Sequence, residues 1–302
     1  MLSVPDICRH GCVAIGNFDG VHLGHQAMLA VLKDLAARQC VPAVVVTFSP
    51  HPLTVLRPEV APCPLTTVSD RQTLLQQLGV DHVVILPVTK QLLQFTAQQF
   101  FDDVLVRDLA VRGLVEGRNF HFGRDRGGNI QTLTELCRGQ GIELQVVDLV
   151  GDAGPVSSSR IRELLGAGKV AAANELLGRH YRLSSPVIRG AGRGASIGFP
   201  TANLAPPEIL VPGHGVYAGI AAVDGRDFTS AIHIGPNPTF ADDTSKIECW
   251  LDGYSGDLYD QTLTVRFVRE IRQLKSFPSA AELVEQIQRD VEACRTAVRS
   301  LS

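Results

Sequence analysis

The chain has 302 residues, enough for about two domains of ordinary size, each with its own core. Its 28 basic and 31 acidic residues leave a formal net charge of −3, and this near balance argues against a general nucleic-acid-binding protein. Hydrophobic residues make up 45% of the chain, yet no apolar run reaches the roughly 18 residues that a membrane helix needs.

In the first half, short apolar runs alternate with helical patterns. The expected strands are Cys12–Ile15, Ala43–Phe48, His82–Leu86, Arg112–Val115 and Leu144–Leu149. The expected helices are Leu23–Arg38, Asp70–Leu78, Ala97–Leu109 and Ile130–Arg138. Strands that alternate with helices predict βαβ units and a parallel sheet, which binds ligands at the carboxyl ends of its strands.

The pattern changes after about Leu177. Short strand-like segments with Gly, Pro and Asp between them predict a small barrel or sandwich. These segments are Pro186–Ile188, Val216–Val223, Ser230–Ile234, Ile247–Leu251 and Leu263–Val268. A last helix, Ser279 to Arg299, has one apolar stripe that can lie against this domain. We place the boundary between domains 1–180 and 181–302.

Residues 16–25 read GNFDGVHLGH between an expected strand and an expected helix. A helix N-terminus presents unpaired N–H groups and the positive end of the helix dipole, which suit phosphate groups. Gly16 and Gly20 let the backbone approach a ligand closely. His22 and His25 are three residues apart, so both can donate hydrogen bonds to a triphosphate as charge moves to the leaving pyrophosphate. From the residues alone, a metal site and plain surface histidines stay open.

Residues 190–203 read GAGRGASIGFPTAN. The start matches a GxGxxA dinucleotide fingerprint, but Gly194, Gly198 and Pro200 oppose the helix that this fingerprint requires. The chain also lacks a GxxxxGK[ST] motif. A flexible glycine loop can still wrap phosphates with its backbone N–H groups. Thr201 and Asn203 face one side of an extended backbone and offer the hard oxygen ligands that Mg²⁺ prefers.

The first segment resembles the GxFDGxHxGH signature of HIGH nucleotidyltransferases and, more closely, that of prokaryotic bifunctional riboflavin kinase/FAD synthetases. Further strings match that family in order: TFSPHP at 47–52, LGVD at 78–81, GRNFHFG at 117–123 and SSSRIR at 157–162. The second segment is similar to the GxxLGFPTAN region of riboflavin kinases, followed by GVYA at 215–218, IGPNPTF at 234–240 and DLY at 257–259.

This resemblance extends from about residue 10 to the C-terminus. It implies a Rossmann-like parallel α/β nucleotidyltransferase domain, followed by a Greek-key β-barrel riboflavin kinase domain with a terminal helix. The second domain would phosphorylate riboflavin with ATP to give FMN. The first would transfer AMP from ATP to FMN, giving FAD and pyrophosphate.

The resemblance also implies roles for individual residues in the first domain. His22 and His25 would be catalytic, and Phe48, His51 and Pro52 would border the flavin. ATP and its phosphates would be bound by Gly16, Phe18, Asp19, Gly20, Gly24, Asn119, Ser158, Ser159 and Arg162. Ser159 replaces the threonine of many relatives but keeps a hydroxyl group. From the residues alone, other roles stay open: a turn for Asn119, strand-end packing for residues 48–52, and a plain helix cap for residues 157–162.

In the second domain, the resemblance makes Glu248 the general base, at the start of a strand after the PTF string. Gly192, Arg193, Gly194 and Gly198 would cover the ATP phosphates, and Thr201 and Asn203 would bind Mg²⁺. Ala195 stands where many relatives have a basic or polar residue. From the residues alone, a solvent-facing strand residue stays open for Glu248.

Two other functions stay open: a nucleotidyltransferase of the nicotinate-mononucleotide or phosphopantetheine type, and a flavin-binding sensor without activity. The 7 cysteines show no CxxC spacing, and Asp6 and Arg9 interrupt the region where a signal peptide would be apolar. We therefore expect a cytoplasmic enzyme. Its cofactor is Mg²⁺, with ATP as co-substrate and FMN and FAD as product ligands. Its partners are the small molecules riboflavin, FMN and ATP, without nucleic acid or membrane, and its oligomeric state is open.

Overall fold

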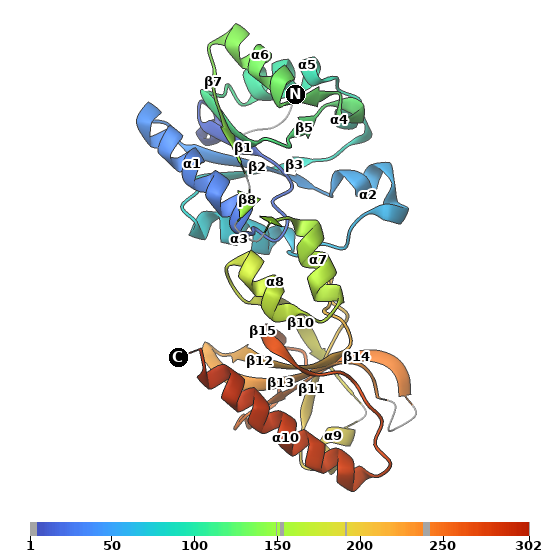
Figure 1. The fold of residues 1–302 in the computed structure, drawn as a ribbon. Helices are drawn as coiled ribbons and strands as arrows, with labels where there is room; N and C mark the ends of the chain where they lie inside the picture. The colour runs from blue at the N-terminus through green and yellow to red at the C-terminus, as the bar shows by residue number, and fades with distance from the viewer. Residues whose placement is uncertain (1–4, 149, 152–153, 191, 238–241, 302) are drawn as a thin grey trace. The chain divides into compact units, whose positions relative to one another are not determined.

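A computed structural model describes residues 5–148, 150–151, 154–190, 192–237 and 242–301 (Figure 1). The chain divides into two compact units, Met1–Ser158 and Ser159–Ser302. Among the described residues, no helix is both long and apolar enough to cross a membrane.

The first unit is built on a five-stranded parallel sheet in the order β3-β2-β1-β4-β7. The strands are β1 (Cys12–Ile15), β2 (Ala43–Ser49), β3 (His82–Pro87), β4 (Gly113–Gly117) and β7 (Glu143–Val147). This sheet confirms the predicted parallel α/β domain. Strands are added on one side of β1 up to β3 and on its other side from β4, so the carboxyl ends of β1 and β4 form a topological switch point, where such sheets bind ligands.

Both faces of the sheet are covered, because alternate strand residues point to opposite sides. Val13 and Val44 belong to one apolar cluster, with the π-helix η3 (Phe100–Asp108) and α6 (Ile130–Gln140). Ala14 and Val45 belong to the other cluster, with α1 (Leu23–Gln39) and α3 (Val68–Gln77). The fold is therefore doubly wound around the parallel sheet that the alternation of elements predicts.

The segment predicted as one helix over Ala97–Leu109 is instead a short α5 (Ala97–Gln99) followed by η3. The wider π-helical turn shows in the hydrogen bond from the Leu109 N–H to the Val104 carbonyl, five residues back. Phe101, Val104 and Leu105 are each 1% exposed, so the π-helical segment is packed against the sheet. Periodicity alone does not distinguish the two helix types over so few turns.

Several short elements were not predicted, because one or two turns or a two-residue strand leave no periodic pattern. They are η1 (Asp6–Cys8), α2 (Pro52–Leu56), η2 (Pro58–Val60), α4 (Lys90–Leu93), β5 (His121–Phe122), η4 (Arg124–Arg126), β6 (Gly128–Asn129), β8 (Val150–Gly151) and β9 (Gly154–Pro155). Leu149, the predicted end of the fifth strand, lies outside the described residues.

The second unit contains a closed antiparallel barrel in the order β10-β11-β14-β13-β12-β15, with β15 paired back to β10. This confirms the predicted barrel. Its strands are β10 (Tyr181–Ile188), β11 (Thr201–Leu204), β12 (Gly215–Val223), β13 (Arg226–Asn237), β14 (Asp242–Leu251) and β15 (Thr262–Arg272). Tyr217, Ile232, Cys249 and Phe267 fill its interior, each 0% exposed.

The helices described in this unit are α7 (Ser158–Gly166), whose first residue is the last of the first unit, α8 (Val170–Leu177), α9 (Arg193–Ser196) and α10 (Ala280–Arg299). The predicted terminal helix, α10, runs along the outside of the barrel, where Cys294 and Ala297 pack against Ala218 and Val268 (Figure 1). Judged by contacts between residues, α7 and α8 belong to the same unit as the barrel. The predicted boundary between residues 180 and 181 separates the two expected activities, and it stays a prediction.

Two candidate active sites

The first candidate site lies where β1 passes into α1 through residues 16–22. His22 is the N-cap residue of α1, and its Nδ1 accepts the backbone N–H of His25 at 3.3 Å. The neutral ring therefore carries its hydrogen on Nε2. The two imidazole rings stack, with centroids 3.6 Å apart and planes 13° apart. Two donor-capable rings thus lie together at the positive end of a helix, a place that suits a phosphate group.

The loop before α1 has an unusual backbone. Phe18 and Val21 have φ angles of 47° and 41°, in the left-handed region that such residues rarely adopt. The Phe18 side chain is 1% exposed, and its ring centroid lies 5.0 Å from that of His25. Strained backbone persists only where neighbouring groups hold it, and it is concentrated at functional sites.

Two glycines of the motif are close to these rings. A Cβ added at Gly24 would lie 3.2 Å from the His22 ring, closer than nearly all such contacts. A Cβ added at Gly16 would meet the Phe18 ring at 3.4 Å. Gly24 therefore allows the His22 ring to stack on His25.

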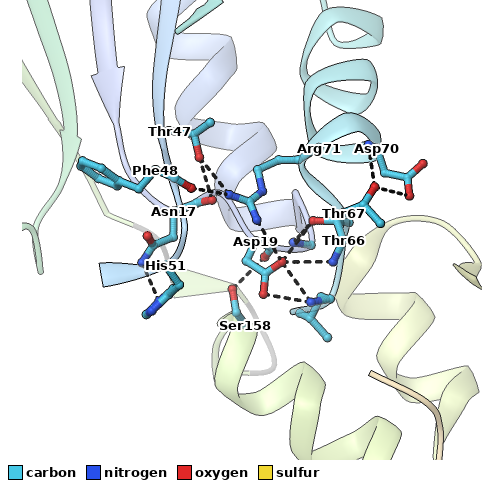
Figure 2. Close-up of polar contacts among 12 residues, drawn as sticks. Asn17, Asp19, Thr47, Phe48, His51, Thr66, Thr67, Asp70, Arg71 and Ser158 are labelled. Carbon is cyan, nitrogen blue, oxygen red and sulfur yellow. Dashed lines mark hydrogen bonds and ion pairs between the residues drawn. The ribbon is translucent and has the colours of Figure 1, made fainter. Parts of the chain in front are cut away.

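The Asp19 carboxylate is 4% exposed and holds the loop against residues 65–66 (Figure 2). It accepts the N–H of Leu65 at 3.0 Å, and the N–H and hydroxyl of Thr66, both at 3.1 Å. The Ser158 hydroxyl donates to the Asp19 carbonyl oxygen at 2.8 Å. These contacts give Asp19 a part in shaping the loop, while its predicted role in binding the nucleotide stays a prediction.

The residues predicted to border the flavin lie at and after the end of β2. Phe48 packs against the apolar cluster that holds Val13. His51 is the N-cap residue of α2, with its Nδ1 accepting the Leu53 N–H at 3.1 Å, and Pro52 is the first residue of that helix. The Asn17 side-chain amide lies 3.0 Å from His51 Nε2, so the loop before α1 and the predicted flavin edge are in direct contact.

The remaining predicted phosphate ligands are not all brought to this site by the described contacts. Asn119 follows β4 and is exposed. Ser159 is exposed and Arg162 is half-buried, and both belong to the second compact unit. Their contacts with a nucleotide stay predictions.

Glu116 is a buried acid at the switch point of the sheet. It lies in β4, is 1% exposed, and its Oε1 accepts the N–H of Ile15 at 2.8 Å. Burial raises the pKa of this carboxyl well above its usual value, although the Ile15 hydrogen bond opposes the shift. The side chain ties the end of β1, where the first site begins, to β4.

The second candidate site lies on the outer face of the barrel. Asn203 of β11 pairs with Glu248 of β14, and Glu248 pairs with His233 of β13. Directly paired residues on neighbouring strands point to the same side, so these three side chains form a row. Their neighbours Ile232 and Cys249 point the other way, into the barrel core.

This row lines a cavity of about 150 Å³, and Thr201 is also part of its lining. Leu283, Ile287 and Val291 of α10 line it from one element, and Gly192 and Gly194 from the glycine-rich loop. The predicted base, the predicted metal ligands and part of the predicted phosphate loop therefore share one cavity.

The glycine-rich loop turns back on itself beside this cavity. In the described part of this loop, 190 and 192–203, the single turn α9 is the only helix that forms, in keeping with the expectation that Gly194, Gly198 and Pro200 oppose a longer helix. The Phe199 N–H donates to the Gly194 carbonyl at 2.8 Å, and a Cβ added at Gly194 would lie 2.3 Å from the Phe199 oxygen. Gly192 and Gly198 have φ angles of 68° and 88°, which glycine adopts without strain.

Charged groups surround Glu248 in the cavity. Lys246, Arg272 and Lys275 line it and provide positive charge suited to phosphate. Arg272 is held by Asp290 of α10, to which its Nε and terminal nitrogen donate at 2.9 and 2.7 Å. Burial lowers the pKa of His233, against the opposing effect of the Glu248 charge.

One prediction about Glu248 was wrong in detail. It lies well inside β14 rather than at the start of a strand, because the β13–β14 pairing continues to Asn237 and Asp242. The predicted PTF string, Pro238 to Phe240, lies outside the described residues.

Comparisons with known proteins identify the family. Residues 5–160 match the family model of FAD synthetases, and residues 177–298 match that of riboflavin kinases. A bifunctional riboflavin kinase/FMN adenylyltransferase of Pseudomonas fluorescens is 39% identical over 95% of this chain and 93% of its own length. The chain belongs to this bifunctional family. The FAD synthetase match covers the site at His22, and the riboflavin kinase match covers the site at Glu248, so the predicted family and enzyme class are confirmed.

Two further proteins are similar to this chain over nearly its full length. The bifunctional enzyme of Escherichia coli strain K12 is 34% identical over 93% of this chain and 91% of its own length. A crystal structure of a macrolide-efflux protein from Streptococcus pneumoniae has a TM-score of 0.86 and 28% identity, covering 95% of this chain and 94% of that one. The efflux role in that name describes the streptococcal protein.

Three residues at the two sites were not predicted from the sequence. Arg71 is buried beside the loop that contains Asp19. The sequence feature that could have indicated this is its position four residues before Leu75, which places both residues on the buried face of α3. His233 faces Glu248, and its signal was a polar residue inside an apolar strand. Glu116 left a similar signal in β4, whose other buried side chains are apolar.

Proposed function

We propose that this member of the bifunctional family makes FAD from riboflavin in two steps, with one residue set for each. The residues of the second unit transfer the γ-phosphoryl group of ATP to riboflavin, giving FMN and ADP. The residues of the predicted domain 1–180, which include Ser159 and Arg162, join FMN to AMP from a second ATP and release pyrophosphate. The observation that carries this assignment is that the stacked His22–His25 pair belongs to residues 1–158, while the row through Glu248 belongs to residues 159–302.

In the phosphorylation step, Glu248 accepts the proton of the riboflavin 5′-hydroxyl as that oxygen attacks the γ-phosphorus. Lys246, Arg272 and Lys275, which line the same cavity, offset the charge of the transferring group. The backbone N–H groups of the loop with Gly192, Arg193, Gly194 and Gly198 cover the phosphates.

The residues present fit a Mg²⁺ ion in this cavity. Thr201 and Asn203 line it together and offer a hydroxyl and an amide oxygen beside the Glu248 carboxylate, the hard donors that Mg²⁺ prefers. When bound, Mg²⁺ neutralises charge on the nucleotide phosphates. The part of Thr201 and Asn203 is then to orient the γ-phosphoryl group toward the riboflavin oxygen.

In the adenylylation step, the FMN phosphate attacks the α-phosphorus of ATP. This nucleophile is already ionised near neutral pH, so orientation and charge stabilisation replace a general base. His22 and His25 donate to the triphosphate as pyrophosphate leaves, with Asn119 and Arg162 as further phosphate ligands. The loop from Gly16 to Gly24, with Ser158 and Ser159, holds the nucleotide, and residues 48–52 border the flavin.

We place this chemistry in the cytoplasm, where thiols stay reduced and ATP is abundant. The partners that the two reactions require are small molecules, and the net charge of −3 does not favour nucleic acid. The oligomeric state is an experimental question, answered by sedimentation at equilibrium.

Two variants test the division of labour. Glu248→Gln removes the base but keeps the size of the side chain, so riboflavin phosphorylation falls by about 10²- to 10⁴-fold. His25→Ala removes a triphosphate donor, so adenylylation of supplied FMN falls by about 10²- to 10³-fold. Each variant keeps the other activity. Flavins are separated by chromatography after incubation with ATP and Mg²⁺.

Matched controls are Glu285→Gln, on an exposed face of α10, and His10→Ala, in the exposed N-terminal segment. Both should leave both activities intact. Loss of both activities in either folded test variant would contradict two separate sites. A protein that purifies yellow and converts neither riboflavin nor FMN would be a flavin-binding sensor instead.

A further inference from the structure

Arg71 is a charged side chain in the interior of the first unit (Figure 2). It lies in the first turn of α3 and is only 7% exposed. A buried guanidinium is costly unless its charge and its N–H groups are matched. One terminal nitrogen lies 3.7 Å from the Asp19 carboxylate. The other donates to the Thr47 hydroxyl at 3.1 Å and to the Phe48 carbonyl at 3.3 Å.

These contacts join the two halves of the first site. On one side, Asp19 belongs to the strained loop that leads into His22 and His25. On the other side, Thr47 and Phe48 form the carboxyl end of β2, which leads into the predicted flavin edge.

Thr47 adds a second link between the loop before α1 and the end of β2. Its hydroxyl accepts from Arg71 and donates to the carbonyl oxygen of Asn17 at 3.0 Å, so one side chain reaches both the guanidinium and the loop. Thr47 is 1% exposed. Because water is excluded there, each of these hydrogen bonds lacks a solvent substitute.

We propose that Arg71 is a positioning residue for adenylyl transfer, acting through Asp19 on the nucleotide loop and through Thr47 and Phe48 on the flavin side. The inference rests on the assignment of FMN adenylylation to the first unit. In that reaction the FMN phosphate and the α-phosphorus of ATP must meet in line, so the spacing between the two halves sets the rate. Arg71 touches neither substrate in this account.

The shape of the side chain explains why arginine stands here. A guanidinium presents its N–H groups in a rigid fork, and its two terminal nitrogens point to Asp19 and to the end of β2 at once. A lysine offers the same charge from a single nitrogen on a flexible stem. It can keep the attraction to Asp19 but does not hold both sides at a defined distance.

The test compares Arg71→Gln and Arg71→Lys with the wild type in adenylylation of supplied FMN. Misplacement of reacting groups by about 1 Å can cost 10²-fold in rate, so we expect kcat of Arg71→Gln to fall by about that factor. Because neither substrate contact is removed, KM for FMN and ATP should change by less than about threefold. Arg71→Lys should recover part of kcat.

Riboflavin phosphorylation by the same preparations should stay unchanged, and Arg38→Gln is the matched control. Arg38 is an arginine of the same unit whose side chain is 56% exposed and pairs with Glu143. All rates are measured well below the thermal transition of each variant, so that the folded fraction does not limit them. A purely structural role would lower that transition but leave kcat of the folded enzyme unchanged, which would overturn the proposal.

A second pair of variants decides the matter if Arg71→Gln does not fold. Thr47→Val is isosteric and removes the shared hydroxyl, whereas Thr47→Ser keeps it. We expect Thr47→Val to lower kcat by about tenfold, near the effect of one buried hydrogen bond, and Thr47→Ser to resemble the wild type. Equal rates for the two variants would overturn the proposal. A wild type that leaves supplied FMN unconverted would instead overturn the assignment of the reaction itself.

Discussion

The two units build their candidate sites from different kinds of structural element. In the first unit the strands are parallel, so their carboxyl ends meet at one edge, and the loop after β1 leads into the N-terminus of α1. Backbone N–H groups and the helix dipole are available there. In the closed barrel, each strand is paired on both sides, and the interior is filled by side chains. The second site is therefore built from side chains on the outer face, beneath α10.

Because of this difference, we expect the two sites to be disturbed by different kinds of substitution. The first site depends on a strained loop and on the buried groups that hold it, namely Asp19, Thr47 and Arg71. The second depends on strand register, which aligns Asn203, Glu248 and His233, and on the docking of α10 over them. A change that disturbs one support should leave the chemistry of the other unit intact.

The largest effect is expected from Asp290→Ala, which breaks the link between α10 and β15. Asp290 is 4% exposed and accepts hydrogen bonds from Nε and one terminal nitrogen of Arg272, whose charge would be left without this partner. Loss of one member of a buried pair costs about 3 kcal/mol or more of unfolding free energy. Riboflavin phosphorylation should fall with it, because Arg272 lines the cavity, while FMN adenylylation persists. Urea unfolding followed by both assays measures this.

The matched control is Asp227→Asn, which removes an exposed ion pair with Arg266 in the same barrel. Exposed pairs contribute about 0 to 1 kcal/mol, so little change is expected. Similar losses from Asp290→Ala and Asp227→Asn would show that docking of α10 does not depend on the buried pair.

A pH-dependent effect is expected from Glu116→Gln in the first unit. Burial raises the folded-state pKa of Glu116, so the wild-type carboxyl favours folding below its unfolded pKa, near 4.5, and loses this advantage as pH rises toward the folded value. Between these two values the stability of the wild type relative to Glu116→Gln falls by about 1.4 kcal/mol per pH unit. The variant should therefore gain in relative stability from pH 4 to pH 8, as measured by urea unfolding.

Glu143→Gln, in β7 of the same sheet, should show the opposite dependence of relative stability on pH. Hydrogen bonds from Gln145 and Gln39 lower the pKa of Glu143, so its contribution is present above about pH 4.5 and is lost as pH falls. A Glu116→Gln difference that does not vary with pH would show that this carboxyl keeps the same pKa in the folded and unfolded chain.

The smallest effect is expected from a pair of helix caps, one in each unit. Ser279 caps α10 by accepting the N–H of Glu282 at 3.3 Å, and Thr67 caps α3 by accepting the N–H of Asp70 at 3.0 Å. Replacing either residue with alanine costs about 1 kcal/mol. Ser279→Ala should slow riboflavin phosphorylation only, and Thr67→Ala should slow FMN adenylylation only. Thermal unfolding and the two assays, run side by side, would reveal any cross-effect that contradicts independent sites.

Elements whose cause is local were predictable from the chain. β1 begins and ends at the predicted residues, Cys12 and Ile15, and α10 follows the apolar stripe that Leu283, Ile287 and Val291 supply. The Gly16–His25 string likewise placed a helix start directly after a strand. Both patterns arise from residues near one another in sequence, where periodicity and capping act.

The chain pattern indicated, without tertiary information, a parallel domain followed by a small barrel or sandwich, and a helix start suited to phosphate in the first domain. Tertiary structure alone decided that Arg71 joins Asp19 to Thr47, that Glu116 meets Ile15 and that His233 stands opposite Glu248. The separations between these partners run from 15 to 101 residues. Such contacts depend on strand order and register, which no local preference encodes, and burial then determines how strongly each charge acts.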